Sequence, residues 1–172
     1  MLPIAIIAIA IQPVWMPILS EYHKTDATWA RTKRWGEETG MFYKEGKILM
    51  PEGYPSYTYS LVQYGKVEGK NILGQMFDPF YYMEGEPFDN WGEARKIVLK
   101  WLKDENVRLL LADKTIVAVG PQRIDNRRYL ELIRREPELF NKVGALTNFA
   151  GLGEEILEIY EVYPGKILLD ED

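Results

Sequence analysis

The pattern of hydrophobic and polar positions divides the chain into a short uncharged start and a long run of alternating helix-like and strand-like segments. Residues 1–19 contain no charged side chain, and the first charge is Glu21. Beyond it, apolar positions recur at the periods typical of helices and strands. We expect helices over residues 25–40 and 90–104, a helix from Asp125 that contains Tyr129, Leu132 and Ile133, a helical turn from Pro137 to Gly144, and strands over residues 47–50, 107–111, 115–119, 146–150 and 156–163.

Two of these segments have the clearest patterns. The first is the helix over residues 90–104, where one face is predicted to be buried because apolar residues follow the i, i+3, i+4, i+7, i+8 spacing, namely Ala94, Ile97, Val98, Trp101 and Leu102. The second is Val107–Leu111, whose nearly continuous apolar sequence is typical of a central strand covered on both faces.

The middle of the chain is harder to interpret. Glycine and proline in residues 52–61 predict a turn that leads into an extended segment, where Tyr57 and Tyr59 would share one face of a strand. Residues 62–90 predict a long irregular loop that is rich in aromatic side chains. Loops of this length inside one domain are uncommon and often functional.

Alternating helices and strands favour an α/β fold, although a mixed α+β arrangement fits the same pattern. The 172 residues suffice for one ordinary domain and a short anchor. We therefore expect residues 1–22 to be a membrane anchor or the end of a transmembrane helix. Residues 23–165 would form a single soluble α/β domain, and residues 166–172 an acidic tail.

Three interpretations compete for the uncharged start. A membrane-type helix is favoured because Met1–Leu19 approaches the length that spans a bilayer and Trp15 suits the interface, which makes membrane lipid a partner. A secretory signal peptide fits less well, because no basic residue precedes the apolar run. The third is a buried strand over Ile4–Ile11, where isoleucine and alanine alternate.

The amino-acid composition argues against several classes of function and site. The formal net charge of −5 argues against nucleic acid as a partner, because nucleic-acid binding needs an excess of Lys and Arg. A basic cluster follows the apolar run and consists of Lys24, Arg31, Lys33 and Arg34. It would either contact anionic lipid head groups or form an ordinary solvent-exposed charged surface. The lack of cysteine excludes disulfides, thiolate zinc sites and cysteine nucleophiles. Abundant charged residues together with no cysteine favour a thermophilic source.

The sequence contains no catalytic constellation that stands on its own, and it predicts neither a cofactor nor a metal site. His23 is the single histidine and lies in no motif. The acidic residues Glu84, Glu86 and Asp89 do not have the spacing of a calcium loop. Asp78 and Asp89 could act as the acid and the base of a glycosidase. That reaction requires a particular distance between the two carboxyl groups, and the sequence does not give this distance.

Aromatic side chains provide the candidate binding residues. A platform for a sugar or a peptide is predicted from Tyr54, Tyr57, Tyr59, Asp78, Tyr81, Tyr82 and Trp91. Aromatic faces pack on sugar rings, and tyrosine hydroxyls form hydrogen bonds. The alternative is that these rings form part of the domain's own core.

The second half of the chain also resembles a known group of proteins. The resemblance rests on Trp101–Leu111, Arg128–Ile133, Pro137–Phe140 and Ile159–Val162, and it extends over about Lys47–Tyr163. These segments are similar to the C-terminal soluble domains of polytopic membrane glycosyltransferases that use lipid-phosphate-linked sugars. The group comprises oligosaccharyltransferase-like and mannosyltransferase-like membrane proteins of archaea and bacteria.

This resemblance implies a mixed α/β domain that follows the last membrane span and lies outside the cytoplasm. The family's catalytic carboxylates lie in loops between spans, and its Trp-Trp-Asp signature is absent from this sequence. The resemblance therefore implies an accessory domain that is not catalytic by itself and contributes to binding a glycan, glycolipid or peptide acceptor. Against this location, the basic cluster behind the apolar run would favour the cytoplasmic side.

Two other functions stay open. One is a soluble binding module in which the N-terminal run is a buried strand. A carbohydrate hydrolase ranks last.

Overall fold

Strand β3 (Val107–Asp113) is the middle strand of a five-stranded mixed sheet, as the nearly continuous apolar sequence of Val107–Leu111 predicts. The structure is a computed structural model, which describes residues 30–50, 55–74, 78–80, 83, 85–113, 121–149 and 152–167. The described sheet has the order β2-β1-β3-β5-β4. Its other strands are β1 (Lys47–Leu49), β2 (Ile72–Leu73), β4 (Phe140–Phe149) and β5 (Leu152–Val162).

The sheet joins two kinds of strand pairing. Strand β1 pairs in parallel with both β2 and β3. Strand β5 runs antiparallel to β3 and to β4, so one side of the described sheet is a long antiparallel pair. Strand β2 contributes only two residues and forms one edge of the described sheet.

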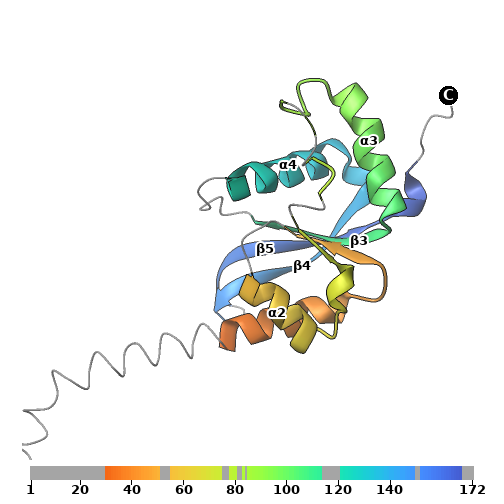
Figure 1. The fold of residues 1–172 in the computed structure, drawn as a ribbon. Coiled ribbons are helices and arrows are strands. Elements are labelled where there is room, and N and C mark those ends of the chain that lie inside the picture. Colours follow the sequence, from red (N-terminus) through yellow and green to blue (C-terminus); the bar gives the residue numbers. More distant parts are fainter. Residues whose placement is uncertain are drawn as a thin grey trace, which may run out of the picture.

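Helices cover both faces of this sheet (Figure 1). Helices α3 (Trp91–Asp104) and α4 (Pro121–Arg135) lie on one face, and α2 (Pro55–Gln63) lies on the other with the helix over residues 30–42. Short 3-10 turns connect the elements: η1 (Gly69–Asn71), η3 (Pro137–Leu139) and η4 (Pro164–Lys166). The observed architecture is thus the layered mixed α/β fold that the alternating pattern predicts.

Each face of the sheet has its own hydrophobic core, and neighbouring strand residues point into opposite cores. Ile48 packs with Trp35 and Leu61 on the α2 side, whereas the adjacent Leu49 packs with Val98 and Leu102 on the α3 side. The same alternation continues along β3. The inner residues of both strands are apolar because each face of the sheet is covered there.

Two sequence predictions about helix ends were wrong, and both concern residues next to proline. The segment over residues 52–61 was predicted as a turn and an extended strand, but α2 begins at Pro55. Proline suits the first position of a helix because its φ angle is already helical and the missing N–H would have no partner there. For the same reason α4 begins at Pro121, four residues before the predicted start at Asp125.

Two glycines predicted to end helices instead lie inside regular elements. The first helix continues through Gly40 to residue 42. Gly144 lies within β4, where the strand begins directly after η3, so the predicted helical turn ends at Leu139. An added Cβ on Gly144 would come 2.8 Å from the Phe42 ring, which explains glycine at this position.

The two helices on the α2 side cross at unusually close distance. A Cβ placed on Gly40 would lie 2.6 Å from the Gly65 Cα atom, and one on Gly36 would come within 3.0 Å of the Ser60 carbonyl oxygen. The Ser60 hydroxyl also donates a hydrogen bond to the Thr32 carbonyl oxygen. Small residues therefore allow the two backbones to touch.

Several predictions fall on parts of the chain that the structure leaves undescribed. They are the membrane-type helix or buried strand within residues 1–29, the strand over 115–119 and the acidic tail beyond residue 167. Within the described parts, no helix combines the length and the apolar character that spanning a bilayer requires.

Candidate functional site

A cleft of about 730 Å³ lies between α3 and the edge strand β2. We call it the edge cleft. Its walls come from four regions of the fold, namely β1, the η1–β2 segment, the short stretch that ends at Met83, and the C-terminal half of α3. The described lining residues are Lys47, Gly69, Lys70, Ile72, Leu73, Asp78, Pro79, Met83, Ile97, Trp101 and Glu105.

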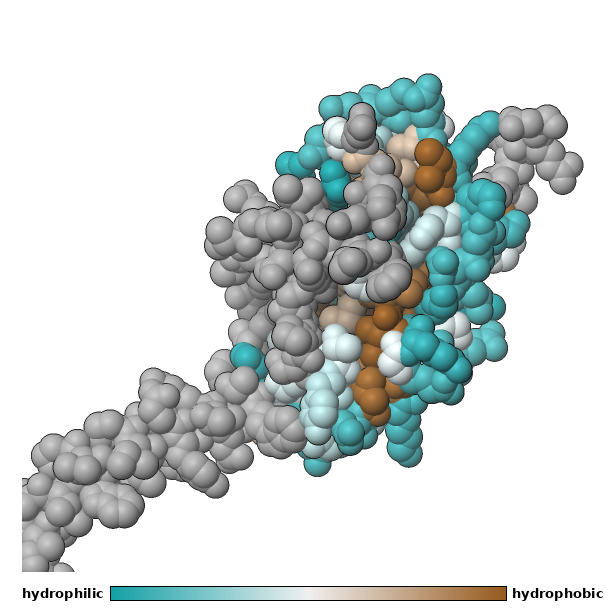
Figure 2. Space-filling model, viewed as in Figure 1, coloured by the Kyte–Doolittle hydropathy of each residue, from teal (hydrophilic) through white to brown (hydrophobic). Residues whose placement is uncertain are grey.

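The edge cleft is mainly apolar. Ile97 and Trp101 lie one helical turn apart on α3 and face the cleft from one side. Ile97 is 59% exposed although it is a large aliphatic side chain, and Trp101 is half-buried. Figure 2 shows hydrophobic residues exposed on this side of the molecule, bordered by hydrophilic ones. Such an accessible apolar wall is typical of ligand sites rather than of a closed core.

Charged groups are placed at defined points of the edge cleft. Asp78 is buried, and its carboxylate accepts hydrogen bonds from the Phe80 N–H and from the Tyr129 hydroxyl at 2.8 Å. Lys47 forms an ion pair with Glu105 at the end of α3. These contacts hold both carboxylates in fixed positions beside the apolar wall of the cleft.

Lys70 lies at the exposed rim of the edge cleft. Its ammonium group is 2.6 Å from the Glu68 carboxylate. This hydrogen bond and the charge of Glu68 raise the pKa of Lys70 above its ordinary value. Lys70 therefore keeps its positive charge at the mouth of the cleft.

The structure places the predicted binding residues in different parts of the fold. Asp78 lines the edge cleft. Tyr59 lies on α2, on the opposite face of the sheet, and is half exposed. Tyr57 is also in α2, so the two tyrosines are not on one face of a strand. Tyr54, Tyr81 and Tyr82 lie outside the described residues.

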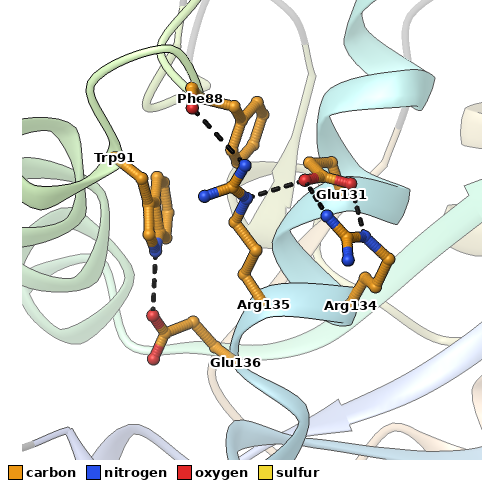
Figure 3. Close-up of polar contacts among 6 residues, drawn as sticks. All are labelled: Phe88, Trp91, Glu131, Arg134, Arg135 and Glu136. Carbon is orange, nitrogen blue, oxygen red and sulfur yellow. Dashed lines mark hydrogen bonds and ion pairs between the residues drawn. The ribbon is translucent and has the colours of Figure 1, made fainter.

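Trp91 belongs to an aromatic cluster in the core of the α3–α4 side. Its ring stacks on Phe88 with 5.0 Å between ring centroids, and Phe88 in turn contacts the fully buried Phe80. Figure 3 shows the Trp91 indole N–H directed at the Glu136 carboxylate, 3.1 Å away. Trp91 is partly buried and packs against the hydrophobic core on this side of the sheet.

Glu136 is the buried acceptor that ties α3 to α4. Arg95 donates two hydrogen bonds to it, at 2.6 and 2.9 Å, in addition to the bond from Trp91. Burial alone would raise the pKa of Glu136, but the hydrogen bonds from Arg95 and Trp91 lower it by more. The carboxylate therefore stays ionised and acts as a structural clamp.

A second carboxylate, Glu131, sits between two arginines on α4 (Figure 3). Arg134 donates hydrogen bonds to it at 2.5 and 2.7 Å, and Arg135 donates one at 2.7 Å. Mainly because of the hydrogen bond from Arg134, the pKa of Glu131 falls from 4.5 to about 2. Arg135 also lies over the rings of Phe88 and Trp91, so this ion pair supports the aromatic cluster.

These lowered pKa values predict that acid destabilises the domain. Folding favours the ionised form of Glu131, so its contribution to stability is complete above about pH 4.5 and is lost as the pH falls towards 2. Chemical denaturation at a series of pH values should show the free energy of unfolding decreasing over this window. The Glu131→Gln variant should show a shallower decrease. An equal slope in both proteins would contradict the assigned ion pair.

The pair Asp78 and Asp89 is not brought into one pocket. Asp78 lines the edge cleft, whereas the exposed Asp89 lines a separate hollow beside α4 together with Glu86 and Arg127. Among the residues that the structure describes, no group of three or more His, Cys, Asp or Glu side chains converges on a possible metal position.

Sequence reasoning missed the side chains that build the edge cleft. Ile97 and Trp101 were assigned to the buried face of the helix, but the buried positions are Ala94, Val98, Leu99 and Leu102. Both residues extend the apolar stripe of the helix beyond the positions that the core buries. These additional apolar positions are the signal in the sequence that indicated a second contact surface.

Comparison with known proteins adds no relative: no family model matches the chain, and no curated protein or solved structure shows significant similarity to it.

Proposed function

We propose that this chain is a membrane-tethered accessory domain of a lipid-linked sugar transferase, not catalytic by itself, which binds the glycan part of a substrate in the edge cleft. The proposal places the domain outside the cytoplasm. The observation that carries it is the edge cleft itself, because an open apolar wall meets fixed carboxylates there.

The chemistry of the cleft suits a sugar. Sugar rings have apolar C–H faces that pack on aromatic and aliphatic side chains, here Trp101 and Ile97. Their hydroxyl groups donate to carboxylate oxygens, which Asp78 and Glu105 provide. The volume of about 730 Å³ is in the range of small-ligand sites.

A binding role rather than a catalytic one is supported by how the carboxylates are used. Asp78 is held by Tyr129 and the Phe80 N–H, and Glu105 by Lys47. The described carboxyl groups whose pKa values are shifted are Glu131 and Glu136. Both form ion pairs with arginine side chains, and neither lines the cleft. A catalytic carboxyl group usually has a pKa raised towards neutrality.

The family resemblance supports the same proposal. The similar segment Trp101–Leu111 begins at a cleft-lining residue of α3 and continues into the central strand β3. The segment Ile159–Val162 lies in β5, directly beside β3. Of the four similar segments, Trp101–Leu111 is the one that contributes residues to the described lining of the cleft.

A peptide acceptor is the second candidate. Strand β2 lies at the edge of the described sheet and borders the cleft with Ile72 and Leu73. An extended peptide can add to such an edge through its backbone while its side chains occupy the neighbouring pocket.

The test uses the full chain in lipid nanodiscs and measures binding to a panel of soluble hexose and N-acetylhexosamine oligosaccharides and of short unstructured peptides. We expect a glycan to bind and the Ile97→Arg variant to weaken that binding about tenfold or more, because the new side chain removes apolar contact from an exposed position. Ile97 is largely exposed, so this variant should fold normally.

The matched control is Lys103→Ala, an exposed residue of the same helix that does not line the cleft. It should bind like the unchanged protein. Peptide binding that Ile97→Arg abolishes would favour the second candidate. If the Ile97→Arg variant binds the glycan as tightly as the unchanged protein, the cleft is not the binding site.

A further inference from the structure

We propose that the outer face of the helix pair formed by residues 30–42 and α2 lies on the membrane surface, with lipid head groups as its partner. We call this surface the helix-pair face. The inference rests on the membrane tether of the proposed function, and it adds an orientation for the domain.

Both helices of the pair carry exposed apolar side chains. Among the described residues, four large hydrophobic side chains are exposed: Met41 at 73%, Ile97 at 59%, Tyr59 at 50% and Val62 at 40%. Ile97 belongs to the edge cleft. The other three lie on the helix pair, and Tyr59 and Val62 are three residues apart on α2, which places them on one side of that helix.

The two helices present a single rigid surface. The first helix approaches the α2 backbone closely where Gly36 meets Ser60, and Gly40 meets Gly65 just after α2. Trp35 fixes the first helix to the sheet, because its indole N–H donates a hydrogen bond of 2.9 Å to the Thr147 carbonyl oxygen. The exposed side chains are therefore held in a fixed arrangement rather than on a loose segment.

The exposed side chains of the helix pair include types that favour a head-group layer. Lys33 is exposed on the first helix, where it forms an ion pair with Glu37, and it lies 5.3 Å from the centre of the Tyr64 ring, directly after α2. Lysine side chains attract anionic lipids, and tyrosine prefers the boundary between water and lipid. Tyr59 on α2 meets the second preference, and Val62 and Met41 add apolar side chains to the two helices.

The sequence before the helix pair brings this surface close to lipid. The uncharged segment ends at Leu19, and ten residues separate it from Ala30. Even fully extended, this connection spans at most about 38 Å. If Met1–Leu19 is in the membrane, the first helix of the pair is the described element nearest to the membrane in the sequence.

This orientation has a consequence for the edge cleft. Helix α3 lies on the opposite face of the sheet from α2 (Figure 1), so the helix that carries Ile97 and Trp101 is separated from the lipid side by the sheet. Layers of packed secondary structure are about 10 Å apart. The cleft would then meet the water-exposed part of a lipid-linked substrate rather than its lipid chain.

Site-directed spin labelling tests the orientation directly, because the chain has no cysteine of its own. Single variants Met41→Cys, Val62→Cys and Ile97→Cys carry a nitroxide label in the full chain, reconstituted in vesicles of zwitterionic and anionic phospholipids. We expect labels at residues 41 and 62 to be about fivefold less accessible to a water-soluble nickel complex than the label at residue 97.

Flotation of the same vesicles separates this proposal from the tether. Chain that floats with the vesicles, while all three labels are equally accessible, overturns the helix-pair orientation and leaves the tether intact. Chain that does not float overturns both. Magnetic broadening between labels of neighbouring molecules at residue 62 would identify a second copy of the chain on this face and would also overturn the proposal.

Discussion

The Gly40→Ala variant is expected to lose about 3 kcal/mol of its free energy of unfolding, because an added methyl group would overlap the backbone at Gly65, two residues after the end of α2. The new Cβ would lie 2.6 Å from both the Cα atom and the carbonyl oxygen of Gly65. Both are backbone atoms, so no side chain can move aside to relieve the overlap. Gly36→Ala should have a similar effect, since its Cβ would meet the Ser60 backbone. Urea denaturation followed by circular dichroism measures both changes.

Gly92→Ala is the matched control. Gly92 is also helical, in the first turn of α3, but a Cβ there would have no atom within 4 Å. Alanine is a better helix former than glycine, so this variant should be about 0.5 kcal/mol more stable than the unchanged protein. If Gly40→Ala and Gly92→Ala changed stability alike, the close crossing of the two helices would be refuted.

Replacing Glu136 with glutamine is expected to cost about 2 kcal/mol. The neutral amide removes the charge that faces Arg95 and leaves the guanidinium with a weaker acceptor, while Trp91 competes for the remaining oxygen. Glu136 is 4% exposed, so water does not easily replace the lost interaction. Thermal and urea unfolding should show the loss, and near-ultraviolet circular dichroism should report a changed Trp91 environment.

Glu37→Gln provides the comparison for this second variant. Glu37 forms a helical i, i+4 ion pair with Lys33 at 3.8 Å, and both side chains are about half exposed. Pairs of this kind contribute about 0.5 kcal/mol or less. A loss at Glu136 no larger than the loss at Glu37 would mean that the clamp between α3 and α4 contributes little.

The sequence predicted those elements whose pattern is set by burial. Val107–Leu111 is nearly continuously apolar, interrupted by Arg108, because β3 is covered on both faces, and helix α3 has an apolar stripe because it packs along the sheet. Strand β2 was missed because two residues are too few to show a period. Strand β2 forms because it pairs with β1, which lies more than 20 residues earlier in the sequence. The local sequence of β2 does not reveal this partner.

Glycine and proline misled the prediction because each has more than one structural use. Pro55 and Pro121 were taken as breaks, whereas they occupy the first positions of helices. Gly40 was taken as a helix end, whereas it provides room for Gly65. Which use applies depends on the neighbour in space, and a single sequence does not name that neighbour.

The candidate site was only partly predictable for a related reason. Asp78 was identified and does line the edge cleft, but the aromatic residue that the cleft presents is Trp101 rather than Trp91. Both tryptophans belong to the same helix and fit its apolar pattern. Their roles differ because Trp91 meets Phe88 and Glu136, whereas Trp101 reaches the sheet edge beside Ile72.

The most direct test of the central claim is methyl NMR of the full chain in nanodiscs during titration with the glycan that binds. The edge cleft is lined by methyl groups of Ile72, Leu73, Met83 and Ile97. We predict that these four signals shift together and saturate at one dissociation constant, while Leu146 and Leu157 on the α2 side stay unchanged. Saturable shifts confined to the α2 side, with the four cleft signals unmoved, would contradict the account.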